Sequence, residues 1–391
     1  MRHGRRLFLL LALAALALGA VVALAPGGAA SPRSHRPRAA SPPGSTPPGL
    51  AGALQASIDG ARRRTGEPGV SAAVVSHGRL IWSGVSGRAR ISPSVPVTPA
   101  TLFSLASLTK TYTAALTLRL VERGRLRLSD TVGRWLGRRV RRAARPIRVR
   151  ELLMQTSGLP DYLDTGDLDA QFADPNHRWR QAELLREVRA PRGRGGYHYS
   201  NTNYMLLGPI DARAGRGPFG SLLGRLVLRP LGLSDTFIER DPRAAARVAH
   251  SYDMTGGRLG DHFARARGVP TDVWGPLFPD GGVVASAADV ARFLDALYGG
   301  RFLAPATLGR MLRPGPDGSY GMGTYRFSFH GHRFQGHDGA YGGFASDGFT
   351  DRRRGLTLAV LVNGLPTDDR TSPVDETFDA LSDAVDRAGV G

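Results

Sequence analysis

Lys110 is the only lysine in a chain of 391 residues whose lysines and arginines together number 52. It follows Ser107 by three residues in the stretch Phe103-Ser-Leu-Ala-Ser-Leu-Thr-Lys110. An arginine guanidinium keeps its proton in proteins, whereas a desolvated lysine can lose one and act as a base. Residues three apart lie on one face of a helix, so Ser107 and Lys110 would be neighbours. The spacing predicts a serine nucleophile that is served by Lys110.

Two later motifs give this serine–lysine pair its specificity. The pair alone is a weak signal, but Tyr199-Ser-Asn201 and His337-Asp-Gly339 follow it in order. The three motifs resemble those of the penicillin-recognising serine hydrolases. Within that group the sequence is most similar to the serine D-alanyl-D-alanine carboxypeptidases, whose relatives include class C β-lactamases and serine esterases. The resemblance covers residues 50–385 and includes Leu152–Leu159, Gly281–Asp289, Tyr320–Gly323 and Gly336–Gly343.

The resemblance implies a role for each motif residue. Ser107 would attack an acyl carbon and form an acyl-enzyme that water later hydrolyses. The base would be Lys110 or Tyr199, whose free pKa values are about 10.4 and about 10. To accept a proton near neutral pH, the pKa of one of them must be lowered by about 3 units. His337 completes the expected catalytic set, at a position that is usually taken by a cation. Backbone N–H groups of Ser107 and Ala340 would form the oxyanion hole. The residues expected to bind substrate are Asn201, Asp338, Gly339 and Ala340.

Two positions depart from the pattern of that group. Asp338 stands where the carboxypeptidase-like members often have a hydroxyl residue, and an ionised carboxylate would repel a substrate carboxylate that threonine can bind. Arg326 would supply a carboxylate-binding cation instead. Gln155 stands where the group often has histidine, and nothing in the sequence explains this change. These departures weaken the peptidase assignment and leave the hydrolase assignment unchanged.

Several other polar residues have simpler interpretations. Asp161-Tyr162 and Asp280-Gly281 are interpreted as loop residues that line the cleft without a catalytic role. His330 and His332 lie two residues apart and would share one face of a strand, but no third metal ligand accompanies them. We therefore expect neither a metal nor an organic cofactor.

The composition narrows the choice of partner. The formal net charge is +19, but the arginines are scattered, and the densest run, from Arg138 to Arg150, has no aromatic residue on which a base could stack. We expect no nucleic-acid partner and interpret the charge as a solvated surface, with attraction to an anionic cell-wall polymer as the alternative. The absence of cysteine excludes disulfides and a thiol nucleophile.

The chain divides into three predicted regions. Residues 1–30 have a basic start and an apolar run from Leu7 to Leu24, which predicts a signal peptide or an N-terminal membrane anchor. Residues 31–49 are rich in Pro, Ser and Arg and are predicted to form an extended linker. Residues 50–391 would form the hydrolase domain. We expect an extracytoplasmic protein, either secreted or anchored at the outer face of the membrane.

The pattern of elements predicts an α+β fold. A hairpin around His77-Gly78 near the start and strands within 325–363 near the end suggest one antiparallel sheet that is closed by the two ends of the chain. Between them, residues 125–300 read mainly as helices and loops. Expected helices include one beyond Ser107 with an apolar stripe, one capped by Ser286 and one at 377–385. The resemblance implies the β-lactamase/transpeptidase-like fold.

The leading functional expectation is an exported D-alanyl-D-alanine carboxypeptidase-like serine hydrolase that acts on a peptidoglycan peptide or a small molecule. An esterase and a β-lactamase are alternatives of the same fold. A non-catalytic cell-wall-binding protein is the alternative from another class, although the intact motifs argue against it.

Overall fold

The structure, a computed structural model, describes residues 49–391 except 165, 167–173, 178, 239–240, 265 and 270–277. The predicted export segment, and the predicted linker up to residue 48, lie outside the described residues. In the described part of the chain, no helix combines the length and the apolar character that crossing a membrane requires.

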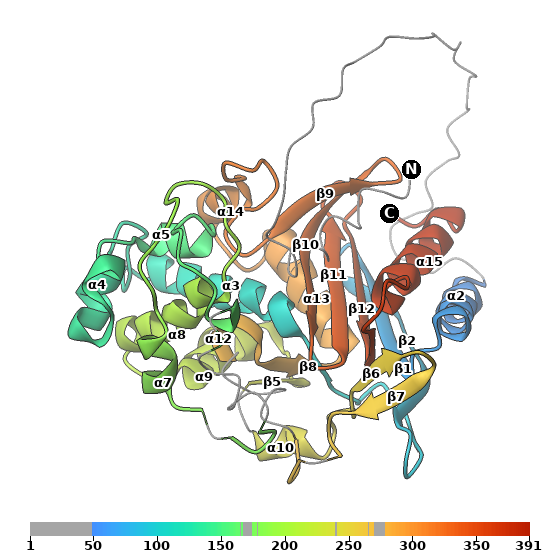
Figure 1. Ribbon diagram of the computed structural model, residues 1–391. Coiled ribbons are helices and arrows are strands. Elements are labelled where there is room, and N and C mark those ends of the chain that lie inside the picture. Colours follow the sequence, from blue (N-terminus) through green and yellow to red (C-terminus); the bar gives the residue numbers. More distant parts are fainter. Residues whose placement is uncertain are drawn as a thin grey trace, which may run out of the picture. The chain divides into compact units, whose positions relative to one another are not determined.

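The main sheet is antiparallel, and its central strands come from opposite ends of the chain (Figure 1). Val70 pairs with Val362 and Ser76 with Leu356 across the two central strands. Both strands are buried on both faces, so they read as continuous apolar runs. The predicted sheet closed by the two chain ends is thereby confirmed. In sheet order the strands are β3 (Val95–Pro96), β2 (Arg79–Arg90), β1 (Gly69–Ser76), β12 (Leu356–Val362), β11 (Phe344–Asp351), β10 (His332–Tyr341) and β9 (Tyr325–Phe329).

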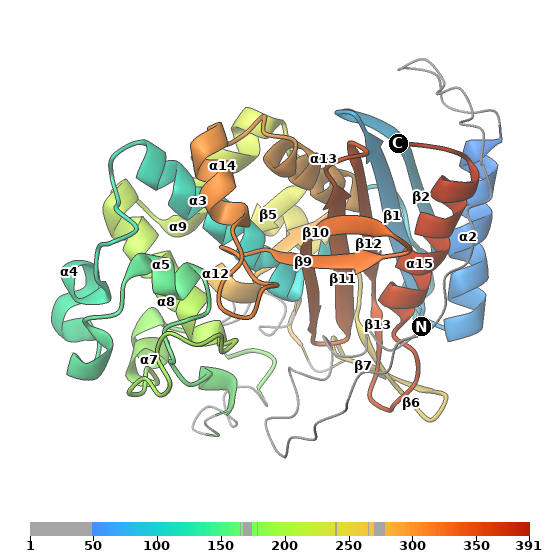
Figure 2. The same cartoon turned by 90° about the horizontal axis from the view of Figure 1, so that it is seen from above.

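Helices cover both faces of this sheet (Figure 2). α2 (Leu50–Thr65) and α15 (Pro373–Arg387) lie side by side on one face, where Ile58 and Phe378 join an apolar cluster with Val74 and other strand residues. A second apolar cluster includes residues of the opposite face of the sheet and of α3 (Thr109–Glu122) and α13 (Ala287–Tyr298). The Ser286 hydroxyl accepts a hydrogen bond from the Asp289 N–H, which confirms the predicted cap of α13.

The α3 helix differs from the predicted amphipathic helix because it is buried on nearly every side. Its threonines are therefore buried as well, and they satisfy their hydroxyls inside the protein: Thr111 donates to the Gly323 carbonyl at 2.8 Å and Thr117 to Asp211 at 2.7 Å. A helix in this position holds its first turn, which carries Lys110, in the interior.

Short strands between the two halves of the main sheet, and one directly after β12, were not predicted from the sequence. Strands of two to four residues are too short to show an alternating pattern. They form two small sheets, β13 (Gly364–Pro366), β6 (Tyr252–Thr255) and β7 (Arg258–Asp261), and β4 (Phe103–Ser104), β8 (Val283–Ala285) and β5 (Thr236–Ile238). The other helices are α4 (Val132–Leu136), α5 (Val149–Leu153), α7 (Gln181–Arg186), α8 (Asn201–Gly215), α9 (Phe219–Leu223), α10 (Pro242–Ala245), α12 (Phe278–Gly281) and α14 (Pro305–Leu312).

Candidate active site

Ser107 lies on a short 3-10 turn, Ala106–Leu108, that leads into α3. It is the only residue between Thr101 and Leu118 that is not buried. Ala106 has a positive φ of 45°, which is unfavourable for a residue with a side chain and needs support from its surroundings. The Ser346 hydroxyl donates to the Leu105 carbonyl at 2.7 Å, and the Leu105 N–H donates to β8. These bonds fasten the turn so that the Ser107 side chain faces outward.

Gly339 allows strand β10 to pack directly against this turn. A Cβ at position 339 would lie 2.3 Å from the Leu105 carbonyl oxygen and 2.8 Å from the Ser107 backbone nitrogen. Because both atoms belong to the backbone, no side-chain movement could relieve the clash. β9 pairs with β10 as far as Gly336, whereas β11 pairs with it as far as Tyr341. The edge of β10 that includes Asp338 and Gly339 is therefore not covered by β9.

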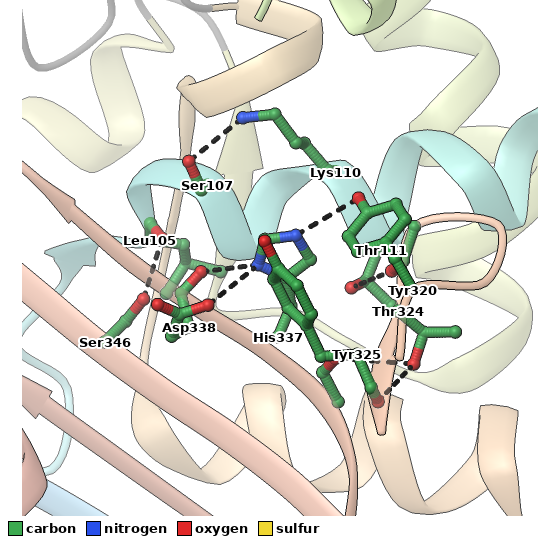
Figure 3. A network of polar contacts seen from close by, with 12 residues as sticks. Leu105, Ser107, Lys110, Thr111, Tyr320, Thr324, Tyr325, His337, Asp338 and Ser346 are labelled. Carbon is green, nitrogen blue, oxygen red and sulfur yellow. Dashed lines mark hydrogen bonds and ion pairs between the residues drawn. The ribbon is translucent and has the colours of Figure 1, made fainter. Parts of the chain in front are cut away.

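The Lys110 ammonium is buried and has three hydrogen-bond acceptors, of which Figure 3 shows Ser107. Its Nζ lies 3.0 Å from Ser107 Oγ, 2.7 Å from Asn201 Oδ1 and 2.8 Å from the Asp280 carbonyl oxygen. Two of these partners, the amide oxygen and the carbonyl, can only accept, whereas the Ser107 hydroxyl can donate or accept. The predicted neighbourhood of Ser107 and Lys110 is present in the structure.

Burial lowers the pKa of Lys110 to about 8, against the opposing effect of three carboxylates. Asp280 acts most strongly, followed by Asp161 and Asp338. Asp280 is itself buried, which raises its pKa to about 7, and its Oδ2 accepts a hydrogen bond from the Tyr162 hydroxyl at 3.0 Å. Its other carboxylate oxygen is buried with no hydrogen-bond partner in the described structure. Lys110 therefore sits in an acidic, water-poor environment.

Asn201 connects Lys110 to Asp161 at the first turn of α8. The Asn201 N–H and Nδ2 both donate to Asp161 Oδ2, at 2.9 and 2.8 Å, while Oδ1 accepts from Lys110. This network fixes the orientation of the amide, because Lys110 offers only donors. Both ends of the Asn201 side chain are thus engaged within the protein, which gives it a structural task besides the expected contact with substrate.

Tyr199 lies beside both members of the pair. Its ring centroid is 5.0 Å from Lys110 Nζ, and its phenol lies near enough to Ser107 for the serine side chain to lower its pKa. Burial raises the pKa of Tyr199 well above its ordinary value, and the influence of Ser107 only partly offsets the effect. The nearby Asp338 charge raises it further. Tyr199 therefore holds its proton at neutral pH more firmly than Lys110 does.

Gln155 supports the loop that carries Tyr199. Its Oε1 accepts hydrogen bonds from the Ser200 N–H at 3.0 Å and from the Asn203 amide, and its carbonyl accepts from the His198 N–H at 2.8 Å. Gln155 is fully buried and has a positive φ of 56°. The Gln155 side chain thus holds the residues that follow Tyr199, while its backbone carbonyl holds the residue before it.

His337 is buried as a neutral ring. Its Nδ1 lies 2.6 Å from the Asp338 carbonyl oxygen, so Nδ1 carries the proton and Nε2 accepts from the Tyr320 hydroxyl at 3.3 Å (Figure 3). Burial, followed by the charge of Lys110, lowers the pKa of His337 to about 3. The resemblance implied a cation at this position, and the structure corrects that expectation because desolvation disfavours the charged ring.

The remaining predicted residues lie at the rim. The Asp338 side chain is 30% exposed, and its carboxylate is 3.5 Å from His337 Nδ1. Ala340 is exposed on the uncovered edge of β10. Arg326 is exposed on β9 and donates to the Gly318 carbonyl at 3.0 Å. Its cross-strand partner is Gln335, so it lies farther along the sheet than His337. Among the rim groups, Asp338 is the one whose charge acts on Lys110 and Tyr199.

The two histidines that were considered as metal ligands pair with different carboxylates. His330 lies 3.1 Å from Asp383, whereas His332 lies 3.5 Å from Asp351 and from Asp386. His330 is in the β9–β10 turn with a positive φ of 47°, so the two rings do not share a strand face as the sequence spacing suggested.

Asp161 and Asp280 are the site residues that the sequence analysis missed. Their sequence context indicates loop residues of the cleft wall, whereas the structure places them among the charges that set the pKa of Lys110. Asp280 reaches Lys110 from 170 positions later in the chain, through its backbone carbonyl. The available signal was weak, because the two acidic residues lie just outside the motif-like stretches at 152–159 and 281–289.

Comparison with known proteins gives matches over most of the described chain. The family model described as Beta-lactamase matches residues 54–381. Esterase EstB of Burkholderia gladioli is 31% identical over 288 residues, which cover 66% of this chain and 73% of that protein. A penicillin-binding protein of Bacillus subtilis (strain 168) is 26% identical over 291 residues, which cover 69% of this chain and 62% of that protein, just under two thirds of its length.

A solved structure is similar over nearly its full length. The D-amino acid amidase of Ochrobactrum anthropi SV3, in complex with L-phenylalanine amide, superposes with a TM-score of 0.73 at 28% sequence identity. The alignment covers 87% of this chain and 99% of that one. The fold inferred from the sequence motifs is therefore confirmed.

Proposed function

We propose that this chain, which belongs to the beta-lactamase family and is a serine hydrolase of that family, cleaves esters or amides through an acyl-enzyme on Ser107. The proposed substrates carry no carboxylate beside the scissile carbonyl. The observation that carries the proposal is the set of three partners around Lys110 Nζ.

These partners suit a neutral amine as well as an ammonium. A neutral Lys110 would donate its two N–H groups to Asn201 Oδ1 and to the Asp280 carbonyl, which only accept. Its lone pair would then face Ser107 Oγ at 3.0 Å, within reach of the hydroxyl proton. With a pKa of about 8, about one tenth of the molecules hold the neutral amine at pH 7. Lys110 is therefore the proposed base.

The reaction proceeds in two steps that use the same groups. Ser107 Oγ bonds to the acyl carbon while its proton passes to Lys110. The carbonyl oxygen of the substrate accepts hydrogen bonds from the backbone N–H groups of Ser107 and Ala340. The bond to the leaving group then breaks, and the leaving group takes a proton from Lys110 or through Tyr199. Water then attacks the acyl carbon and gives a proton to Lys110. The bond to Ser107 Oγ breaks, Oγ takes that proton back, and the acid is released.

The firmly held proton of Tyr199 makes it a donor in this scheme. Its position beside Ser107 and Lys110 places the phenol where it could stabilise the serine oxygen or pass a proton to the leaving group. His337 acts as a positioning residue, because both of its ring nitrogens are engaged by Tyr320 and the backbone. It ties β10 to Tyr320 beside Tyr199.

The charge of the cleft supports the choice of substrate. Three carboxylates, Asp161, Asp280 and Asp338, act on Lys110, and His337 is neutral. The partly exposed Asp338 would face a substrate bound along β10, where it repels a carboxylate and tolerates a neutral or cationic group. The similarity to an esterase and to an amino acid amidase is consistent with such substrates.

A D-alanyl-D-alanine carboxypeptidase is the second candidate. It is favoured by the three motifs, by the similarity to a penicillin-binding protein and by Arg326, an exposed cation on the strand next to β10. The charge of Asp338 acts on the pKa of Lys110, whereas Arg326 is not among the groups that do. We therefore rank this candidate below the esterase or amidase.

Labelling with a fluorophosphonate or a fluorescent penicillin tests the acyl-enzyme. Both reagents acylate or phosphonylate an activated serine, so the wild type should be labelled and Ser107→Ala should not. Ser328→Ala is the matched control, because it removes an exposed serine hydroxyl that does not support the nucleophile turn. Equal labelling of wild type and Ser107→Ala would refute the assignment.

A pair of substrates tests the role of Asp338. We expect Asp338→Asn and Asp338→Thr to raise kcat/KM for a carboxylate-bearing D-Ala peptide relative to a neutral short-chain ester. Asp369→Asn, which removes an exposed carboxylate elsewhere, should leave that ratio unchanged. If Asp338→Asn also leaves it unchanged, charge repulsion does not determine the substrate and the carboxypeptidase candidate is restored.

The proposed location of the protein is outside the cytoplasm. This rests on the basic and apolar segment at residues 1–30, and a reporter fused behind that segment should be exported, whereas one fused after its Arg2, Arg5 and Arg6 are changed to Glu should be retained. A non-catalytic wall-binding protein would bind cell walls but remain unlabelled by both serine reagents, which separates it from the proposed hydrolase.

A further inference from the structure

A basic pocket of about 960 Å³ lies beside the end of α3, outside the active site. Five arginines line it, Arg127, Arg148, Arg150, Arg310 and Arg313, and no acidic residue is among its lining residues. They come from three parts of the chain: the segment after α3, the segment at α5, and α14 with the residues that follow it. All five are exposed. The fold thus brings together arginines from separate parts of the sequence.

The acidic residues near the pocket are occupied by other partners. Glu122 binds Arg119 and the Ala304 N–H, and Glu151 forms two hydrogen bonds with Arg194. Asp130 accepts from a backbone N–H and from Trp135. Within the described part of the chain, none of the five pocket arginines forms an ion pair with a carboxylate. Their charges are therefore available to a ligand.

The shape and the lining of the pocket indicate what kind of anion fits. Its apolar floor includes Leu126, Met154 and Met322, and its volume is that of a small-molecule site or a short polymer segment. Guanidinium groups bind phosphate bidentately, and one phosphate would leave most of the five charges unpaired. A ligand with several phosphates satisfies them better.

We propose that this pocket binds a segment of a polyol-phosphate polymer. The lining contains no aromatic side chain on which a nucleobase could stack, which disfavours single-stranded nucleic acid. The pocket shares its wall with loops that reach the active site: Met154 precedes Gln155, and Met322 precedes Gly323, beside the Lys110 carbonyl. A bound polymer would hold the enzyme at a polyanionic surface while the cleft around Ser107 stays open to a separate substrate.

Binding of fluorescent poly(glycerol phosphate) to the full chain tests this site, with a single-stranded oligonucleotide of equal charge as the second ligand. We expect Arg150→Glu/Arg313→Glu to weaken polymer binding at least about tenfold and to flatten its salt dependence, because each phosphate contact on a single strand contributes about 0.7 to the slope. The matched control, Arg63→Glu/Arg225→Glu, changes the net charge equally at exposed positions outside the pocket and should weaken binding less than about threefold.

Three outcomes would overturn the proposal. Equal losses in the two double variants would show that the whole basic surface binds the polymer. Tighter binding of the oligonucleotide than of the polymer, with the same sensitivity to the pocket variant, would assign the pocket to nucleic acid. No measurable binding of the polymer by the wild type at physiological salt would leave the pocket without this ligand. Thermal melting of both variants, and their unchanged turnover of a small ester, control for folding.

Discussion

Replacing Asp280 with asparagine tests how the site lowers the pKa of Lys110. Asparagine keeps the backbone carbonyl that Lys110 donates to and still offers Tyr162 an oxygen, so the geometry is preserved. It removes the carboxylate that raises the pKa of Lys110 more than any other charge. Burial, which lowers the pKa of Lys110, would then be opposed only by Asp161 and Asp338. The pKa of Lys110 should fall below its value of about 8.

The size of the effect follows from the electrostatics of a buried pair. Lys110 Nζ is 2.8 Å from the Asp280 carbonyl oxygen, which places the carboxylate of the same residue within about 8 Å of the amine. Two unit charges about 7 Å apart interact by about 2.4 kcal/mol at an effective dielectric constant of about 20. Because a pKa of about 7 leaves about half of Asp280 ionised at pH 7, the expected effect is about one pKa unit. A pKa near 7 would make about half of the lysines neutral at pH 7 instead of about one tenth. We therefore expect kcat/KM at pH 7 to rise about fivefold, with no change in the high-pH plateau.

The assay is the pH dependence of kcat/KM for a neutral ester, which reports ionisations of the free enzyme. Activity requires the neutral amine, so it rises as the pH increases through the pKa of Lys110, and Asp280→Asn should shift that rise to lower pH. Asp164→Asn removes an exposed carboxylate of the same side of the cleft and should leave the midpoint in place. An unchanged midpoint in Asp280→Asn, with the plateau retained, would refute the electrostatic argument.

Three further changes test the supporting residues. Gln155→Ala should lower kcat at least tenfold, because the buried Ser200 N–H loses its acceptor. The free energy of unfolding, measured by urea denaturation, should fall by about 1 to 3 kcal/mol. An unchanged kcat would show that Gln155 does not position the loop. Gly339→Ala should abolish labelling of Ser107, because its Cβ would clash with the backbone of the nucleophile turn, and normal labelling would contradict the packing. His337 should contribute no ionisation between pH 5 and 7, since burial lowers its pKa to about 3; a limb in that range that disappears in His337→Asn would show a charged ring instead.

The parts of the fold that the sequence predicts are those with a strong local signal. The central strands are apolar runs long enough to recognise, and Ser286 marks the start of α13 by its type and position. The short strands of the small sheets have no such signal, because their pairing depends on partners far away in the chain. The apolar stripe of α3 was real but incomplete, since a helix covered on all sides also buries threonines that bond to carbonyls.

The candidate site divides in a similar way. Ser107 and Lys110 are three residues apart, so local geometry suffices to bring them together. The choice between Lys110 and Tyr199 depends on burial, which lowers one pKa and raises the other and which no motif encodes. Asp280 contacts Lys110 through a backbone carbonyl, a contact that is independent of the residue type and is therefore invisible in the sequence.

The central claim, an acyl-enzyme on Ser107 formed with Lys110 as the base, is tested most directly by mass spectrometry of the acid-quenched reaction with a short-chain ester. We expect the mass of one acyl group on the wild-type chain, located in the peptide that contains Ser107, and none at neutral pH in Lys110→Arg, because arginine keeps its proton. An acyl group on another residue, or one that persists in Ser107→Ala, would contradict the account.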